Sequence, residues 1–203
     1  MTNKIFLITL ALVLALVSIG LSPGWNFPAA ADFDYYYAVN AVMDRCGPNV
    51  QLLAILMEKR VTKYAFTHGT CGSGSANEYV TVDYDFKTHT VDTLKIGDLR
   101  QVYYFSFPDH QNTRPIPLEA WKVSSGQAFK IVSKQHGFEN LNDFLPLEIV
   151  GQQEIAGGLL LHQEGGSIVW NYIYSNRADE YEIHINATTG QVISSSSRTL
   201  PPL

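Results

Sequence analysis

Basic residues are scarce in this sequence, and they never gather into a run. The chain of 203 residues has 14 Lys and Arg against 19 Asp and Glu, which gives a net charge of -5 at pH 7. Nucleic acids and anionic lipid surfaces select basic protein faces, because their phosphates are negatively charged. The sequence therefore argues against a nucleic acid partner, and its body offers no basic patch for a membrane surface.

Cysteine is also scarce, since only Cys46 and Cys71 are present. No cysteine precedes Cys46, so none lies near the start of the chain where it could take a lipid. In an oxidising compartment an isolated pair most simply forms one disulfide, worth roughly 3 kcal/mol in the chain-entropy model. The alternative is a metal site that adds His68 to the two cysteines, but no fourth ligand occurs nearby. We expect the disulfide, no metal and no cofactor.

The signatures of a hydrolase are missing as well. No Gly-x-Ser-x-Gly elbow occurs, and Ser73 lies in a plain Gly-Ser loop. Asp83 and Asp85 alternate with apolar residues, so they are typical of the solvated side of a strand rather than of calcium ligands or an acid-base pair. We expect a protein that is not an enzyme; a Ser-His hydrolase assembled from scattered positions remains the less favoured alternative.

A long apolar run is present at the start of the chain, from Ile5 to Leu21. It is near the short limit for crossing a hydrocarbon core of about 30 Å at about 1.5 Å per residue. Three alanines before Asp32 give the small-residue pattern that a signal peptidase needs. Residues 1–31 therefore predict a cleaved signal peptide or a retained membrane anchor. In both cases the body lies outside the cytoplasm and meets a membrane only through this segment.

An internal repeat dominates the rest of the sequence. Alternating apolar residues run into a polar turn at Asp85 and again at Asn186, and these two residues are 101 positions apart. Val91 and Val192 follow the turns at the same spacing. Both stretches predict strand, turn and strand. The turn residues in the two copies are Asp85, Thr88, Asn186, Thr189 and Gly190.

Each copy is preceded by a predicted amphipathic helix. Residues 37–47 align without a gap on residues 127–137, and each segment carries an apolar stripe at helical spacing. Gly47 and Gly137 stand where a left-handed C-cap residue belongs. Asp34 and Ser124 or Ser125 are suitable N-caps.

The remaining segments complete a prediction of α+β class. Residues 50–57 form a short apolar run that fits a helix or a buried strand, and we predict a strand. Residues 105–120 are rich in proline and predict a linker. We therefore expect two lobes, at residues 32–104 and 121–196, each a helix packed on an antiparallel sheet, and then a disordered tail at residues 197–203.

The second lobe resembles the PepSY family. The resemblance rests on the helix that begins Gly126-Gln-Ala-Phe-Lys-Ile-Val and on the hairpin from Tyr181 to Ile193, in which Asn186, Thr189 and Gly190 occupy the family's turn positions. Asn186 departs from the family's usual aspartate, and His89 stands in the first lobe where glycine is expected. The resemblance implies a small cystatin-like module of the kind found in propeptides of secreted peptidases and in cell-envelope proteins. The hairpin itself is structural.

The function that follows from this resemblance is non-catalytic binding outside the cytoplasm. We expect a protein or peptide partner, with restraint of a secreted or envelope peptidase as the specific hypothesis, at a sheet edge or in the cleft between the lobes. The alternative is a carrier of a small ligand or metal in that cleft. The residues predicted to form a binding surface are Trp121, His162, Trp170, Tyr172 and Tyr174.

Overall fold

The computed structural model describes residues 31, 33–58, 61–73, 78–85, 87–88, 90–98, 114–136, 147–150, 153–175 and 179–199. The apolar amino-terminal run, Gly137 and positions 105–113 of the predicted linker lie outside these residues. Within the described ranges, no helix is long and apolar enough to cross a membrane.

The helices in the described residues are α2 (Phe33–Cys46), the short 3-10 helix η3 (Leu118–Ala120) and α3 (Ser125–His136). Gly47 ends α2 with φ of 83°, and its N–H donates to the carbonyl of Met43 at 2.9 Å. A left-handed conformation at this position favours glycine, as the sequence predicts. The prediction that Asp34 caps α2 is wrong, because the helix begins at Phe33 and Asp34 is buried within its first turn.

The start of α3 is a reciprocal capping box. The Ser124 hydroxyl accepts a hydrogen bond from the Gln127 N–H at 3.2 Å, and the Gln127 side-chain oxygen accepts one from the Ser124 N–H at 2.8 Å. Two backbone donors that a helix start leaves without partners are thereby satisfied.

The first four strands are β1 (Leu52–Met57), β2 (Val61–Thr67), β3 (Glu78–Asp85) and β4 (Thr90–Asp98). The apolar run at residues 50–57 thus contains a strand, as predicted. The first five residues of β1, Leu52 to Leu56, are all buried. A strand covered on both faces is continuously apolar, which explains why its sequence shows no alternation.

The remaining strands are β5 (Leu147–Val150), β6 (Gln153–Glu164), β7 (Ser167–Ser175), β8 (Asp179–Asn186) and β9 (Val192–Thr199). The predicted disordered tail is wrong for its first three residues, because β9 continues to Thr199. Tyr181 pairs with Ser197 and Asp179 with Thr199. Pairing with β8 holds this segment in a strand although its serines have little intrinsic preference for one. Residues 200–203 lie outside the described residues.

All nine strands form one antiparallel sheet, in the order β4-β3-β2-β1-β6-β7-β8-β9, with β5 pairing beside β6. The prediction of two lobes with separate sheets is corrected here, because β1 and β6 pair from Ala54 with His162 to Met57 with Leu159. This joint satisfies backbone groups that two separate lobes would each leave on an edge strand.

From this joint the strands follow the same order in both directions, which is the arrangement that an internal repeat predicts. We call β1–β4 the N-terminal half of the sheet and β5–β9 the C-terminal half. The repeated turns are built alike. The Asp85 side chain accepts hydrogen bonds from the N–H groups two and three residues later, and the Asn186 side chain does the same. In the second turn Gly190 has φ of 76°.

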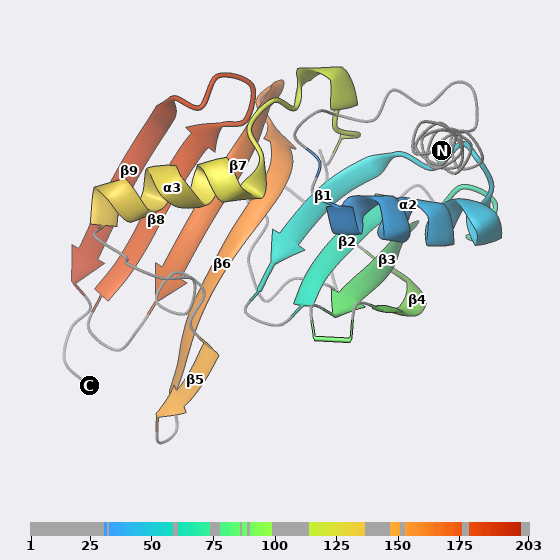
Figure 1. Cartoon of the computed structure of the whole chain (residues 1–203), viewed down its shortest axis with the longest axis horizontal. Helices are drawn as coiled ribbons and strands as arrows, with labels where there is room; N and C mark the ends of the chain where they lie inside the picture. Colours follow the sequence, from blue (N-terminus) through green and yellow to red (C-terminus); the bar gives the residue numbers. More distant parts are fainter. Residues whose placement is uncertain are drawn as a thin grey trace, which may run out of the picture.

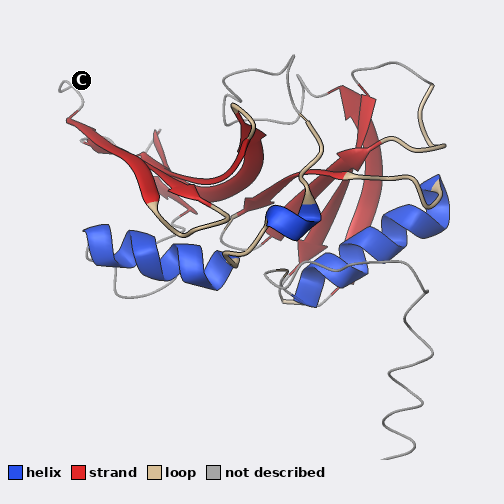
Figure 2. Ribbon diagram, turned by 90° about the horizontal axis from the view of Figure 1, so that it is seen from above, coloured by secondary structure: helices blue, strands red, loops and turns tan. Residues whose placement is uncertain are grey.

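Both helices lie on one face of the sheet, with η3 between them (Figures 1 and 2). The main core fills the space between the helices and this face, and it includes Tyr35, Val42, Ala128 and Trp170. Segment 114–120, predicted as linker, contributes the buried Ile116, whose N–H donates to the Leu52 carbonyl at 2.8 Å. Ile116 therefore anchors this segment to the folded core, while Arg114, Pro115 and Glu119 remain exposed.

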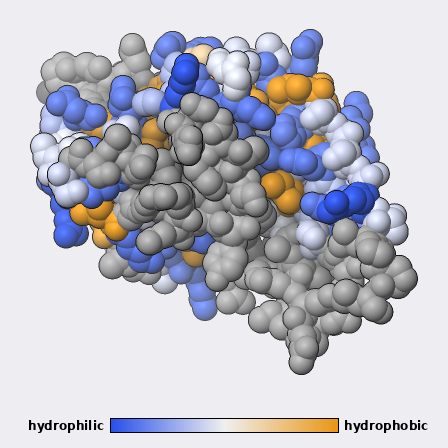
Figure 3. Space-filling model, turned by 180° about the vertical axis from the view of Figure 1, so that it is seen from behind, coloured by the Kyte–Doolittle hydropathy of each residue, from blue (hydrophilic) through white to orange (hydrophobic). Residues whose placement is uncertain are grey.

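The opposite, helix-free face of the sheet carries a second, smaller buried cluster around the joint, made of Leu53, Ala54, Leu56, Ala65, Tyr79 and Leu160. The described atoms seen from this side are mostly hydrophilic, with small and separate apolar patches (Figure 3).

Candidate functional site

The outer edge of the C-terminal half is β9. It pairs with β8 along its length, and each residue from Ile193 to Thr199 is exposed. No other strand in the described part of the chain pairs with β9. Along one side of this strand the backbone N–H and C=O groups can therefore accept another extended chain.

The side chains of β9 are small over most of its length. Ser194 to Ser197 form an unbroken run of serines, and Arg198 then pairs with Glu180 of β8. Small side chains leave an approaching backbone unobstructed. A register shift where β8 pairs with the start of β9 leaves Ile193 out of the pairing, 54% exposed. Such a bulge, like the charge of Arg198, limits uncontrolled edge-to-edge aggregation.

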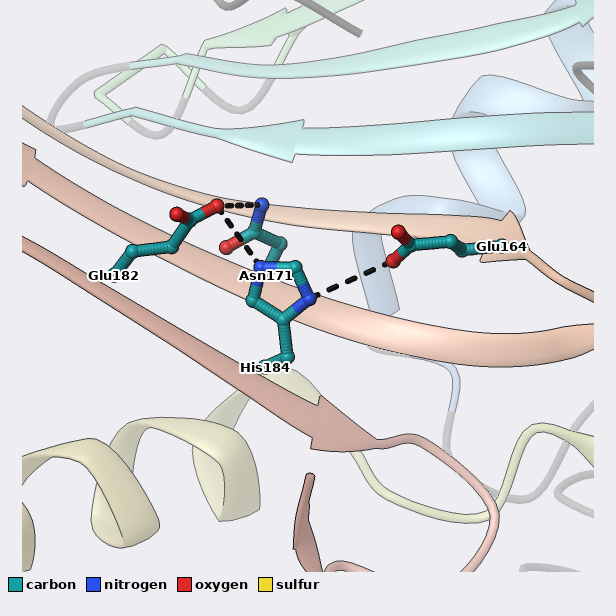
Figure 4. Close-up of polar contacts among 4 residues, drawn as sticks. All are labelled: Glu164, Asn171, Glu182 and His184. Atoms are coloured by element: carbon teal, nitrogen blue, oxygen red, sulfur yellow. Dashed lines mark hydrogen bonds and ion pairs between the residues drawn. The ribbon is translucent and has the colours of Figure 1, made fainter. Parts of the chain in front are cut away.

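A polar cluster lies on the helix-free face of β6, β7 and β8 (Figure 4). Its two residues on β8, Glu182 and His184, are one strand in from the β9 edge. The His184 ring lies between two carboxylates: Nε2 is 2.9 Å from Glu182 Oε1, and Nδ1 is 3.5 Å from Glu164 Oε2. Asn171 donates to the same Glu182 oxygen at 3.1 Å. When the imidazole is protonated, it can donate toward both carboxylates, and Glu182 is held in place from two sides.

Electrostatics keep Glu182 ionised. Partial burial acts to raise the pKa of this carboxyl, but hydrogen bonds from His184 and Asn171 outweigh burial and hold the pKa below its usual range. Glu182 is opposite Ser196 in the register, so this fixed charge lies next to the exposed strand.

His162 is next to the joint, on β6 between Ala54 of β1 and Val169 of β7. It is almost completely buried. Burial lowers its pKa below the usual 6.5, against an opposing effect from Glu164. The imidazole is therefore neutral at pH 7, and it belongs to the interior of the sheet.

The predicted binding surface is wrong as an accessible site. Trp121, Trp170 and Tyr172 are at most 1% exposed and belong to the main core. Tyr174 is partly buried, and its ring lies 5.7 Å from that of Tyr181.

His162 also lies apart from the two tryptophans of the set, whose rings pack together with centroids 6.2 Å apart. The side chains of a strand alternate between its two faces, so Trp170 points toward the helices while His162 points to the helix-free face. Aromatic residues on this sheet cover the core. The residues predicted to line a ligand cleft between the lobes therefore do not form one.

The predicted disulfide is confirmed. Cys46 and Cys71 are bonded, with their Cα atoms 4.8 Å apart, and they join the end of α2 to the loop after β2. The structure thus uses both cysteines in a crosslink. Among the described residues, no group of three or more His, Cys, Asp or Glu is placed to hold a metal ion.

Ser73, considered above as a nucleophile, is engaged with an acid. Its hydroxyl is 2.6 Å from one oxygen of Glu78, and its N–H donates to the other at 2.6 Å. His68 directs Nδ1 to the Gly69 carbonyl at 2.9 Å. These contacts stabilise the loop around the disulfide.

Sequence reasoning missed the exposed edge and the His184 cluster. The sequence pattern places Ser197 of β9 in the predicted tail, and it does not show that His184 meets two carboxylates. The one signal for the cluster is alternation: Glu182 and His184 share the polar face of β8, and register then brings Asn171 opposite His184.

No family model matches the chain, and no curated protein matches it. Among solved structures, the chain is similar to the crystal structure of a "putative lipoprotein" from Clostridium difficile 630, with a TM-score of 0.51 and 14% sequence identity. The match covers 85% of this chain and 100% of the other. At this identity the similarity concerns the fold.

Proposed function

We propose that this protein is a non-catalytic binding module outside the cytoplasm, which takes an extended segment of a protein partner as an additional strand beside β9. The observation that carries this proposal is an eight-residue strand, exposed over seven residues, that pairs on one side only within the described chain. Main-chain hydrogen bonds along such an edge provide affinity, and alternate side chains of the incoming segment provide specificity.

The pairing of the two inner strands argues against a cleft and leaves the outer strands β4 and β9 as the ends of the sheet, of which β9 is the one exposed over seven residues. A partner was expected either at a sheet edge or in a cleft between lobes, and pairing of β1 with β6 closes the gap between the two halves of the sheet. The joint is itself an antiparallel strand addition. The fold thus already uses the type of contact that we assign to β9.

Three observations support a location outside the cytoplasm. The Cys46–Cys71 disulfide is of the type that persists in oxidising compartments. The apolar run at the start of the sequence predicts export or anchoring. The structurally similar protein carries the name "putative lipoprotein". In this chain, membrane contact would be through the apolar segment, because no cysteine lies near it.

The specific partner that we propose is a secreted or envelope peptidase, which the module binds or restrains. This step rests on the PepSY resemblance of the C-terminal half. In its favour are the helix α3 over an antiparallel sheet, the Asn186 turn and the left-handed Gly190.

Site-specific photo-crosslinking tests the edge assignment. A benzoylphenylalanine at Ser196 on β9 is compared with one at Lys130, which is exposed on α3. We expect one partner to crosslink at Ser196 and not at Lys130, through residues of an extended segment. Crosslinking at Lys130 alone, or equal crosslinking at both positions, would show that β9 is not the contact.

The peptidase step has its own test. The crosslinked partner is purified, and its peptidase activity is measured as the wild-type protein is added. Dose-dependent loss of activity, weakened by the Ser195→Pro or Ser196→Pro substitution, supports restraint. A partner without peptidase activity would exclude the peptidase assignment while leaving strand addition intact.

A further inference from the structure

A pocket of about 440 Å³ lies on the helix side of the N-terminal half, away from β9. Its walls come from the first turns of α2, the start of β1, the end of β2 and the segment that leads into η3. The lining residues are Tyr35, Val39, Val50, Gln51, Leu52, Phe66, Pro115, Ile116, Pro117, Leu118 and Glu119. The volume lies within the range of roughly 300–1,000 Å³ that is usual for small-ligand sites.

The walls of this pocket are fixed by contacts on all sides. The Ile116 N–H donates to the Leu52 carbonyl at 2.8 Å, which ties the connecting segment to β1. The Gln51 N–H donates to Thr67 Oγ1 at 2.8 Å, which ties β1 to β2. The Tyr35 ring packs against Phe66 and Trp121, with centroids 6.5 and 5.9 Å away. A pre-formed pocket of this kind costs a ligand little ordering of the protein.

The chemistry of the lining selects a ligand class. Most of the side chains in the wall are aromatic or aliphatic, but polar atoms expose about as much surface to the pocket as apolar atoms do, so the site suits a ligand that joins an apolar body to a polar group. Glu119 is the single charged residue of the lining, and it is exposed at the rim together with Gln51. Pro115 and Pro117 bring no N–H donors to the wall, and the Pro117 carbonyl already accepts a hydrogen bond from the Ala120 N–H at 3.0 Å. The preference for a cation therefore rests on the charge of Glu119, and the net charge of -5 adds a general attraction for cations.

We propose that this pocket binds a small organic cation with an apolar body, seated against Tyr35, Val39 and Phe66 with its ammonium group at Glu119. Tyr35 and Phe66 belong to the lining, where their rings can contact the apolar body of the ligand. The site is independent of β9, so either binding activity can exist without the other.

The test uses three probes of similar size and different charge: 2-phenylethylamine, 2-phenylethanol and 3-phenylpropionate. Binding to the purified protein is followed by the NMR signal of the Trp121 indole N–H, because that ring touches Tyr35 of the wall. We expect a saturable shift with the amine, with affinity at least tenfold above that for the carboxylate. Equal binding of all three probes, or no saturable shift with the amine, would overturn the proposal.

Two variants and a control locate the site. Glu119→Gln removes the rim charge without touching the core, and we expect a threefold to tenfold weaker affinity for the amine and no change for the alcohol. Asp44→Asn removes one exposed charge from α2 outside the pocket and should leave both affinities unchanged. Leu118→Trp fills the pocket and should abolish binding. Unchanged amine affinity in Glu119→Gln, or an equal loss in Asp44→Asn, would contradict the assignment even if Leu118→Trp fails to fold.

Discussion

The indole N–H groups of Trp121 and Trp170 donate to the same acceptor, the carbonyl oxygen of Val123, each at 2.8 Å. The two rings meet edge to face, with centroids 6.2 Å apart. Trp121 precedes α3 and Trp170 is in the middle of β7. One buried carbonyl thus links the segment that enters the C-terminal half to the centre of its sheet.

This shared acceptor predicts non-additive stability effects. In Trp121→Phe or Trp170→Phe alone, the Val123 carbonyl keeps one partner, and we expect each variant to lose about 1–3 kcal/mol from the lost hydrogen bond and reduced packing. In the double variant the buried carbonyl loses both indole donors. We therefore expect the double loss to exceed the sum of the single losses by about 1 kcal/mol or more, as measured by urea unfolding. Strict additivity would mean that the carbonyl finds another donor.

Removal of the disulfide should destabilise the protein measurably. Cys46 and Cys71 are 25 positions apart, and a loop of this size is worth about 3 kcal/mol in the chain-entropy model. We expect the Cys46→Ser, Cys71→Ser double variant to unfold at lower urea concentration by about this free energy, with α2 released first. The wild-type protein under reducing conditions provides the matched comparison. An unchanged urea midpoint in both would show that packing of α2 alone holds this end of the sheet.

Stability should fall as the pH drops below neutrality, because of His162. Burial lowers the pKa of His162 in the folded protein below the ordinary 6.5, so the unfolded chain takes up this proton at a higher pH than the folded chain does. The contribution of neutral His162 is complete above pH 6.5 and is lost as the pH falls toward the folded pKa.

The His162→Leu variant tests this effect, since leucine does not titrate. We expect the free energy of unfolding of the variant to change less than that of the wild type between about pH 7 and pH 5. The carboxylate of Glu182, whose pKa is lowered, contributes to acid sensitivity only below its usual 4.5. A wild-type slope retained in His162→Leu would rule out this histidine as the cause.

The strands of the repeat could be predicted from the sequence because each signal is local. Alternation at Val80, Val82 and Tyr84 identifies a strand with two different faces, and the polar turn after it carries its own hydrogen-bonding chemistry at Asp85. The same holds for Gly47, whose left-handed conformation depends on the residue itself and on the helix before it.

The joint could not be predicted, because the partner of an edge strand is chosen by the whole fold. Nothing in Leu52–Met57 or Gln153–Glu164 specifies that they pair with each other. The same reason explains the error at Ser197, which has low strand preference and is held by its pairing with Tyr181. The aromatic residues misled the site prediction in another way, since Trp170 suits a binding surface and a core equally well until the buried face is known.

Amide hydrogen exchange, resolved residue by residue over Ser194–Arg198, tests the central claim most directly. In the free protein we predict an alternating pattern, with slow exchange at amides that point to β8 and fast exchange at amides that point outward. Addition of the partner identified by crosslinking at Ser196 should slow the fast amides specifically. Uniform slow exchange in the free protein, or fast amides that stay fast in the complex, would contradict strand addition at β9.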